Sequence, residues 1–303
     1  MLIIHDPQCA DYSSYMRPEQ PARATRSAAH LRAAHAGWEW RTPASADEAA
    51  LLLAHTPAHL KRIGHGPDFD DDTPYFPGIG EHGRRAVGAA MAAAEHALRE
   101  RTPVFSLMRP PGHHALREQA MGFCYFNQAA IAAIHAHRQL GAARVAVWDF
   151  DAHHGNGTED ILHHYYLQAA TPADREAILF SSVHELPGYP GTGSKSFDNC
   201  RNRPVPPRGP REQHLAALRE SLEEIVAFAP DLLLISAGFD AYVRDPVAYM
   251  SLELEDYATL GRMVREKCPP GQAGGPAVAT ILEGGYSNDL PLLIDAFLSA
   301  WEN

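Results

Sequence analysis

The chain has 303 residues, of which 45% are hydrophobic, so it can bury a large core as one α/β domain or two smaller ones. Its formal net charge of −11 argues against sequence-independent nucleic-acid binding and leaves open cationic partners such as lysine-rich peptides or polyamines. The four cysteines are scattered without a CxxC pair, so they indicate neither a disulfide framework nor a thiolate zinc site. We find no signal-peptide pattern and no apolar run of about 20 residues that could span a membrane, so we expect a cytoplasmic protein.

Apolar strands and alanine-rich helices alternate along the whole chain. The expected strands are residues 2–4, 104–107, 145–148, 178–183, 231–235 and 277–282. The expected helices are residues 21–35, 46–54, 81–101, 127–140, 157–168, 212–228, 253–268 and 290–301. Glycine and proline predict long loops at 64–80 and 186–211, and a polar turn at 171–174. The alternation predicts an α/β fold, with a central, mostly parallel β-sheet covered by helices on both faces, as one domain over residues 1–303.

The segment 144–157, RVAVWDFDAHHGNG, concentrates polar chemistry directly after a strand. Five side chains in eight residues can bind a metal or a proton, namely Asp149, Asp151, His153, His154 and Asn156. If residues 149–153 stay extended, alternation puts Asp149, Asp151 and His153 on one side. A carboxylate and an imidazole two residues apart suit zinc. A single Asp-x-His pair is more often a polar loop, but here several costly polar groups follow a buried-type strand, which favours a site.

Four polar motifs each begin where a predicted strand stops. They are HH at 113–114, DxDxHH at 149–154, AGFD at 237–240 and GGY at 284–286. In open α/β sheets, ligands bind outside the carboxyl ends of the strands, so motifs far apart in sequence converge at one edge. Each motif is weak by itself, and their joint position predicts the active site at that edge.

Together these motifs contain the groups that a metal-dependent hydrolase needs. Asp151, His153 and Asp240 provide three ligands and leave an open position for water, as a catalytic zinc requires. His113 and His114 can then act as proton-transfer groups.

Three further side chains complete this set. Tyr286 offers a phenolic donor for a developing oxyanion. Asp149 and Asn156 are placed to bond the far nitrogens of the histidine pair and to select their tautomers.

In order and identity, six segments resemble the zinc-dependent histone deacetylase family, which includes bacterial deacetylase-like amidohydrolases and acetylpolyamine amidohydrolases. The segments are RPPGHHA (109–115), GFCYFN (122–127), DFDAHHGNG (149–157), PGTG (190–193), SAGFDA (236–241) and LEGGY (282–286). The resemblance covers about residues 1–300 and implies the arginase-deacetylase fold. It implies that His114 is the general base, that His113 is its electrostatic neighbour and that Tyr286 polarises the scissile carbonyl. It also implies zinc bound by Asp151, His153 and Asp240.

The resemblance implies substrate contacts as well. Gly122 would accept the substrate amide N–H through its carbonyl, and Phe123 and Tyr189 would form the aromatic walls of an acyl-lysine tunnel. Val247 matches a substrate-selecting wall position, and Asp71 or, preferably, Asp72 matches an aspartate at the tunnel rim that holds the substrate backbone. From the residues alone, the acids at 70–72 are more typical of a solvated loop.

Two further assignments follow from the resemblance. Arg23 would line an internal acetate channel, and a structural potassium ion would lie under the zinc site. The positions that match the family's potassium ligands are Asp149, Ser182 and the backbone carbonyls of Asp151, His153 and Val183.

Three positions depart from the family pattern. Asn156 replaces an aspartate, as in the class II branch, and losing that carboxylate favours a neutral His114. Arg17 replaces a histidine near the N-terminus. Residues 165–177 are longer than usual where a second alkali-ion site would lie, so we do not transfer that site.

The expected function is hydrolysis of acetyl- or acyl-lysine, or of a similar small amide, by water that the metal activates. The expected partner is an acyl-lysine peptide or a small acylated amine, with no nucleic acid and no membrane; a homo-oligomer is compatible with this. Acetylpolyamine deacetylation is the nearest alternative, although the apolar Val247 favours acyl-lysine. A non-catalytic acyl-lysine binding module would be expected to lose a ligand or the tyrosine, and a di-manganese ureohydrolase would need a second carboxylate set near Asp240 that the sequence does not show.

Overall fold

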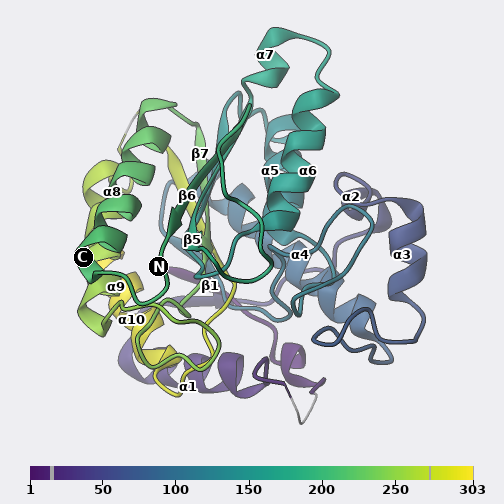
Figure 1. Cartoon of the computed structure of the whole chain (residues 1–303), viewed down its shortest axis with the longest axis horizontal. Coiled ribbons are helices and arrows are strands. Elements are labelled where there is room, and N and C mark those ends of the chain that lie inside the picture. The colour runs from purple at the N-terminus through teal and green to yellow at the C-terminus, as the bar shows by residue number, and fades with distance from the viewer. Residues whose placement is uncertain (14–16, 273, 303) are drawn as a thin grey trace.

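One sheet of eight parallel strands runs through the centre of the molecule (Figure 1). The computed structural model describes residues 1–13, 17–272 and 274–302. In spatial order the strands are β2 (Glu39–Arg41), β1 (Leu2–Ile4), β3 (Val104–Ser106), β8 (Ala277–Leu282), β7 (Leu232–Ala237), β4 (Val145–Asp149), β5 (Ile178–Glu185) and β6 (Cys200–Val205). The prediction of a mostly parallel sheet is therefore confirmed.

Helices cover both faces of the sheet, as Figure 1 shows with α8, α9 and α10 on one side and α4, α5 and α6 on the other. In chain order the helical segments are η1 (Pro7–Ala10), α1 (Ala22–Ala34), α2 (Glu48–Leu51), α3 (Pro57–Ile63), α4 (Ile79–Glu100), α5 (Gln128–Gln139), α6 (Asn156–Leu167), α7 (Pro172–Arg175), α8 (Arg211–Ala227), α9 (Leu254–Lys267) and α10 (Leu290–Glu302). Among the helices of the described residues, none has the length and apolarity needed to cross a membrane.

The inner strands are largely apolar because each one packs against two cores. Along β4, Val145 and Val147 belong to the core beneath α4 and α5, whereas Ala146 and Trp148 belong to the core beneath α8, α9 and α10. All of these side chains are fully buried, and burying one large apolar side chain contributes about 1.5–3 kcal/mol. A strand buried on both faces therefore appears in the sequence as a continuous apolar run rather than an alternating one.

The six predicted strands are present, but four of the sequence expectations need correction. The segment 186–211 is not one surface loop, because it contains β6, and 64–80 is not entirely loop, because α4 begins at Ile79. The expected turn at 171–174 contributes to the short helix α7, and the expected helix 46–54 shortens to α2.

Three other elements, η1, β2 and α3, were not predicted. Strands β2 and β6 lie at the two edges of the sheet, where exposed positions admit polar residues and a proline, so neither has an apolar run. Helix α3 does carry a local signal that was missed, because Thr56 caps its N-terminus and Pro57 occupies its first turn.

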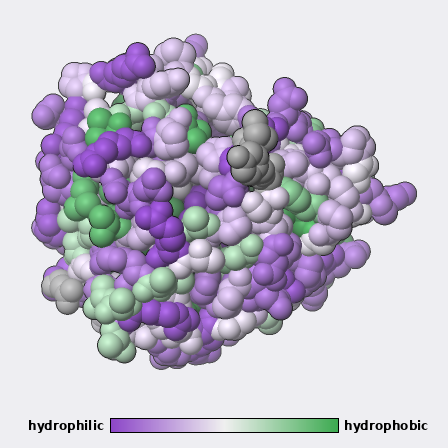
Figure 2. All heavy atoms as spheres, turned by 90° about the horizontal axis from the view of Figure 1, so that it is seen from below, coloured by the Kyte–Doolittle hydropathy of each residue, from purple (hydrophilic) through white to green (hydrophobic). Residues whose placement is uncertain are grey.

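The strand order places the four polar motifs together. Strands β3, β8, β7 and β4 are consecutive neighbours in the sheet, and each is followed by one of the motifs at 113–114, 284–286, 237–240 and 149–154. Because all of the strands are parallel, their carboxyl ends lie at the same edge. Seen from below the orientation of Figure 1, the surface is mostly hydrophilic, with hydrophobic residues in small separate groups (Figure 2).

Candidate active site

Three potential metal ligands converge at the carboxyl edge of the sheet. His153 Nδ1 lies 3.1 Å from Asp151 Oδ1 and 3.0 Å from Asp240 Oδ2, and the three candidate ligand atoms all lie within 4.8 Å of one another. Both carboxylates are fully buried, and His153 is 8% exposed. The sequence prediction that these three residues come together is confirmed.

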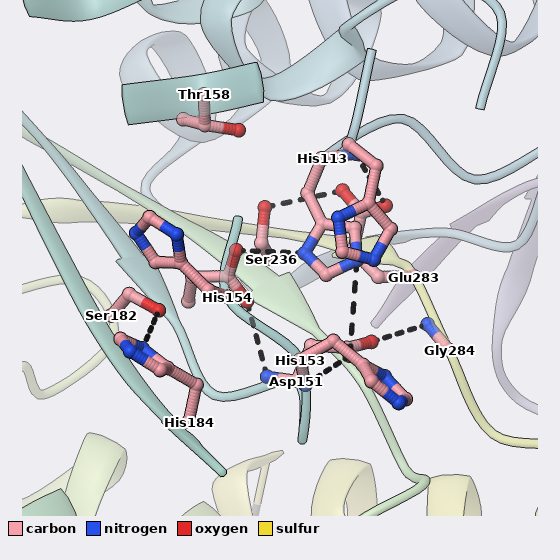
Figure 3. Close-up of polar contacts among 12 residues, drawn as sticks. His113, Asp151, His153, His154, Thr158, Ser182, His184, Ser236, Glu283 and Gly284 are labelled. Carbon is pink, nitrogen blue, oxygen red and sulfur yellow. Dashed lines mark hydrogen bonds and ion pairs between the residues drawn. The ribbon is translucent and has the colours of Figure 1, made fainter. Parts of the chain in front are cut away.

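Backbone amides hold these carboxylates in place and leave one oxygen without a backbone donor. Asp151 Oδ2 accepts a hydrogen bond from Gly284 N at 2.7 Å, and Asp240 Oδ1 accepts one from Ala152 N at 2.9 Å (the Asp151 contact is drawn in Figure 3). Asp240 Oδ2 receives no hydrogen bond of acceptable geometry from the described residues. A buried carboxylate oxygen without a donor is costly, and a bound cation would remove that cost.

Two glycines keep open the space around the ligand oxygens. A Cβ at Gly238 would lie 2.1 Å from Asp151 Oδ2, and a Cβ at Gly284 would lie 2.3 Å from Asp240 Oδ2. Any larger residue would therefore displace a carboxylate. The donor set of two oxygens and one imidazole nitrogen, with excess buried negative charge, fits a divalent ion of the zinc type.

The segment after β4 does not stay extended as the sequence predicted. Strand β4 ends at Asp149, the next residues bend, and Asp149 Oδ1 accepts the backbone N–H of Asp151 at 3.1 Å. Asp149 therefore points to His113, whose Nδ1 lies 3.0 Å from its Oδ2. Only Asp151 and His153 face the ligand group with Asp240.

The paired histidines lie in opposite electrostatic environments. Their ring centroids are 3.9 Å apart, and both rings are almost completely buried. Burial lowers the pKa of His113, but the carboxylates of Asp151 and Asp149 outweigh it and raise that pKa to about 10. Burial lowers the pKa of His114 well below its usual value, and the charges of His113 and His153 lower it further. The pair thus combines a protonated imidazole with a neutral one.

A small cavity of about 150 Å³ opens above the ligands and the histidine pair. It is lined by Asp72, His114, Gly122, Phe123, His153, Tyr189, Val247 and Tyr286. Every predicted tunnel residue thus borders the same space, with the Tyr189 ring perpendicular to that of His114 at 5.0 Å between centroids. Gly122 has a φ of +56°, and a Cβ there would lie 2.5 Å from the His114 ring, so this wall requires glycine.

Tyr286 is held from two sides. Its backbone N–H donates to Asp245 Oδ2 at 2.6 Å, and the guanidinium carbon of Arg23 lies 4.7 Å from its ring centroid. Arg23 is buried and donates to the carbonyls of Glu283 and Gly285. Burial raises the pKa of the Tyr286 phenol well above 10, so the hydroxyl stays a donor at neutral pH.

Sequence reasoning missed Glu283 and Asp245, two buried acids that position the site. Glu283 Oε2 accepts the backbone N–H groups of Gly112 at 2.7 Å and His113 at 3.1 Å, and Ser236 Oγ lies 3.2 Å from Oε1 (Figure 3). Asp245 Oδ1 accepts from Val247 N at 3.0 Å, so this one side chain connects the Tyr286 turn to the cavity wall. Glu283 could have been identified in the sequence from its position in the motif LEGGY, whereas no motif includes Asp245.

The remaining predicted residues lie around this centre. Arg17 Nε is 4.0 Å from Asp72 Oδ1, and the Arg17 guanidinium also donates to the carbonyl of Asp71. Arg23 Nη1 pairs with Glu19 Oε1 at 3.1 Å, and its role in an internal channel stays a prediction.

The predicted potassium positions are adjacent as well. Asp149 and Ser182 are cross-strand neighbours in β4 and β5, followed in the chain by Val183. Ser182 Oγ lies 2.8 Å from His184 Nδ1 (Figure 3). A carboxylate, a hydroxyl and carbonyls are the hard oxygen ligands that such a cation prefers, and potassium here stays a prediction.

Comparisons with known proteins agree with this geometry. Residues 17–299 match the histone deacetylase domain model. A probable deacetylase from Methanothermobacter thermautotrophicus is 34% identical over 94% of this chain and 86% of its own, and a histone deacetylase-like amidohydrolase from Pseudomonas aeruginosa is 37% identical over 81% of this chain and 65% of its own.

Two solved structures share the fold over 99% of this chain. The HDA15 HD domain has a TM-score of 0.87 at 29% identity and is covered over 90% of its length; an acetylpolyamine aminohydrolase from Burkholderia pseudomallei has a TM-score of 0.85 at 25% identity and is covered over 98%. The sheet and helices therefore form the arginase-deacetylase fold. With a family model matched from residue 17 to residue 299, the chain belongs to the histone deacetylase family.

Proposed function

We propose that this chain is a zinc-dependent amidohydrolase that removes acetyl or other acyl groups from acyl-lysine side chains or similar small amides, with residues 1–303 as one catalytic domain. One observation carries the proposal. His153 of the three-ligand group, the neutral His114 and the protonated phenol of Tyr286 line one small cavity. Asp151 and Asp240 lie directly behind His153, and the protonated His113 lies directly behind His114. A merely structural metal site would need neither the histidine pair nor the phenol.

Asp151, His153 and Asp240 would hold the zinc, because they form a buried group in which Asp240 Oδ2 accepts no hydrogen bond of acceptable geometry from the described residues. Bound there, zinc would act as a Lewis acid towards the amide carbonyl and would make water more acidic. Structural potassium at Asp149, Ser182 and the neighbouring carbonyls is part of the same proposal.

His114 is the group that takes the proton from the attacking water. Its Nδ1 lies 2.7 Å from Asn156 Oδ1, and since an amide oxygen can only accept, Nδ1 carries the hydrogen and Nε2 keeps its lone pair. The low pKa of His114 keeps that nitrogen free at neutral pH. A general base of this kind needs the neutral form and a fixed ring orientation, and Asn156 supplies the orientation.

Tyr286 and His113 stabilise the charge that develops. The Tyr286 phenol borders the cavity and would donate to the carbonyl oxygen as it becomes negative, which is when such a donor acts most strongly. His113, protonated through Asp149 and Asp151, places a positive charge beside the reacting atoms. A histidine of the pair then protonates the leaving amine.

The cavity walls favour an aliphatic amine chain. Phe123, Tyr189 and Val247 present largely apolar surface, and Asp72, the one carboxylate among the described residues of the wall, already faces Arg17. The likeness to a solved acetylpolyamine aminohydrolase supports a second candidate, deacetylation of acetylpolyamines. A polyamine has a second ammonium group, for which an unpaired acid at the rim would be expected.

The test compares zinc-loaded wild type on an acetyl-lysine peptide and on N-acetylputrescine. We expect faster turnover of the peptide and no turnover by His153→Ala, while the exposed control His65→Ala retains activity. Faster turnover of N-acetylputrescine would favour the second candidate. No hydrolysis of any acyl amide by protein that contains zinc would contradict the proposal and favour a non-catalytic binding module.

A further inference from the structure

A second hollow lies directly beside the cavity. It measures about 720 Å³ and shares His153, Tyr189 and Val247 with the first, while Glu185, Arg208 and Tyr249 contribute to its other walls. A substrate whose acyl amide enters the cavity would therefore extend the rest of its amine part towards this hollow. The polar groups of the hollow would thus contact the amine part of the substrate, beyond the amide that reacts.

Arg208 is anchored through its backbone at the rim of this hollow. It follows β6 in a tight turn with a φ of +53°, a conformation that few residues other than glycine adopt. Its backbone N–H donates to the carbonyl of Tyr249 at 2.6 Å, and its guanidinium carbon lies 4.9 Å from the Tyr249 ring centroid. The neighbouring carbonyl of Gly209 accepts from Ser251 Oγ at 3.0 Å. The turn is thus tied to the loop that also carries Val247.

The charge of Arg208 is not neutralised. Among the described residues, no carboxylate lies within ion-pair distance of its guanidinium, whereas Arg17 and Arg244 lie near Asp72 and Asp289. The carboxylate in this hollow, Glu185, is 6% exposed, and its Oε2 accepts a hydrogen bond from Tyr249 N at 2.8 Å. The exposed and unpaired charge in the hollow is therefore positive, despite the negative net charge of the chain.

We propose that this hollow is a subsite for a carboxylate carried by the amine part of the substrate, with Arg208 as its recognition residue. The substrate class is an acyl amine with a carboxylate close to the amide, such as an acyl-lysine at the C-terminus of a peptide or free acyl-lysine. The guanidinium offers the bidentate geometry that suits a carboxylate, and Tyr249, 60% exposed, offers a ring face to the apolar part. The inference rests on the proposed function, since it assigns the substrate of that same site.

The kinetic test uses two peptides that end in acetyl-lysine and differ only in a free α-carboxylate or an α-carboxamide. We expect wild type to prefer the carboxylate by about three- to tenfold in kcat/KM, as for one partly exposed charge-assisted contact. The difference should lie in KM, because Arg208 does not touch the reacting atoms, and it should shrink at high salt. Free acetyl-lysine, as a third substrate, separates a peptide terminus from a free amino acid as the source of the carboxylate.

Variants of Arg208 test whether this residue recognises the substrate carboxylate. Arg208→Gln should bring the preference close to one, Arg208→Lys should retain part of it, and Arg208→Glu should invert it. Arg219→Gln, an exposed arginine on α8, is the matched control and should leave the preference unchanged. A wild-type preference near one, or a preference that survives in Arg208→Gln, overturns the inference.

Equilibrium binding separates this inference from the proposed function. Calorimetry of the same two peptides on zinc-loaded Tyr286→Phe measures the preference while turnover is slowed by about 10²–10³, and we expect tighter binding of the carboxylate peptide that depends on Arg208. Hydrolysis by wild type without a charge preference refutes the subsite and leaves the proposed function standing. Charge-dependent binding without hydrolysis supports the subsite and refutes the proposed function. Failure of both peptides to bind refutes the subsite.

Discussion

His114 Nδ1 and Asn156 Oδ1 lie 2.7 Å apart, a contact that orients the ring, while burial and the charges of His113 and His153 hold the pKa of His114 low and keep it neutral. The amide has a fixed direction, because Asn156 Nδ2 faces Met121 Sδ at 3.4 Å. His113, in contrast, faces a carboxylate, Asp149. The carboxylate of Asp149 thus adds to the effect of Asp151 in favouring a charged His113, whereas the amide of Asn156 places no charge beside His114.

Asn156→Asp should shift the pH dependence of the reaction. A carboxylate beside His114 would favour its charged form and raise its pKa, so the base would become available only at higher pH. The acidic limb of the kcat/KM profile should move up by about one to two pH units, with lower activity at neutral pH. Steady-state kinetics between about pH 5 and pH 9, roughly the range in which imidazole titrates, would measure the shift of the acidic limb. An acidic limb that stays in place would exclude His114 as the titrating base.

His153→Ala should empty the metal site. Removing the imidazole leaves two buried carboxylates without their shared nitrogen, so zinc should fall from one per chain to a small fraction. Metal analysis after gel filtration measures this without relying on activity, with His65→Ala as the control. Hydroxamates should bind the wild type and not the variant. A variant with stoichiometric zinc would show that the ligand assignment is wrong.

Tyr286→Phe should lower kcat far more than it changes substrate binding. The phenol donates to an oxygen whose charge grows towards the transition state, and removing one such donor typically costs about 10²–10³ in rate. Zinc content and the unfolding midpoint should match wild type, since Tyr286 lies outside the ligand group. Tyr166→Phe, on α6, is the matched control. Turnover at the wild-type rate would mean that Tyr286 only packs beside its glycine turn.

His214→Leu should stabilise the protein, most of all in mild acid. His214 lies on α8, is 2% exposed, and neither of its ring nitrogens has a hydrogen-bond partner among the described residues. Burial lowers its pKa to about 4, against a small opposing effect of Asp256. As the pH falls, His214 therefore becomes protonated in the unfolded chain before it does so in the folded chain. Wild type loses stability as the pH falls from 6.5 towards 4.

The leucine variant lacks this loss. Its free energy of unfolding should exceed that of wild type by about 1–2 kcal/mol at pH 7, and the gap should widen by about 1.4 kcal/mol per pH unit below 6.5. Urea unfolding at pH 7, 6 and 5 measures the gap. A constant gap would show that the ring is solvated in the folded state.

The amino-acid sequence by itself determined the α/β class, the six inner strands and the three candidate metal ligands. Strands such as β4 are apolar on both faces and therefore visible as continuous runs, and a polar residue that directly follows such a run must lie at the carboxyl edge. The edge strand β6 was not visible, because its half-buried positions carry Arg201 and Arg203 and its exposed position carries Pro204.

Only the tertiary structure decided which strand ends become neighbours and which buried acids support them. Glu283 accepts from His113 N across 170 positions, and Gly284 N donates to Asp151 across 133, so no local spacing encodes either contact. The same holds for Arg208, which the sequence shows as one arginine in a loop and the fold places beside Tyr249. Local patterns report the burial of a segment, whereas the direction of a side chain depends on packing between segments that only the folded chain brings together.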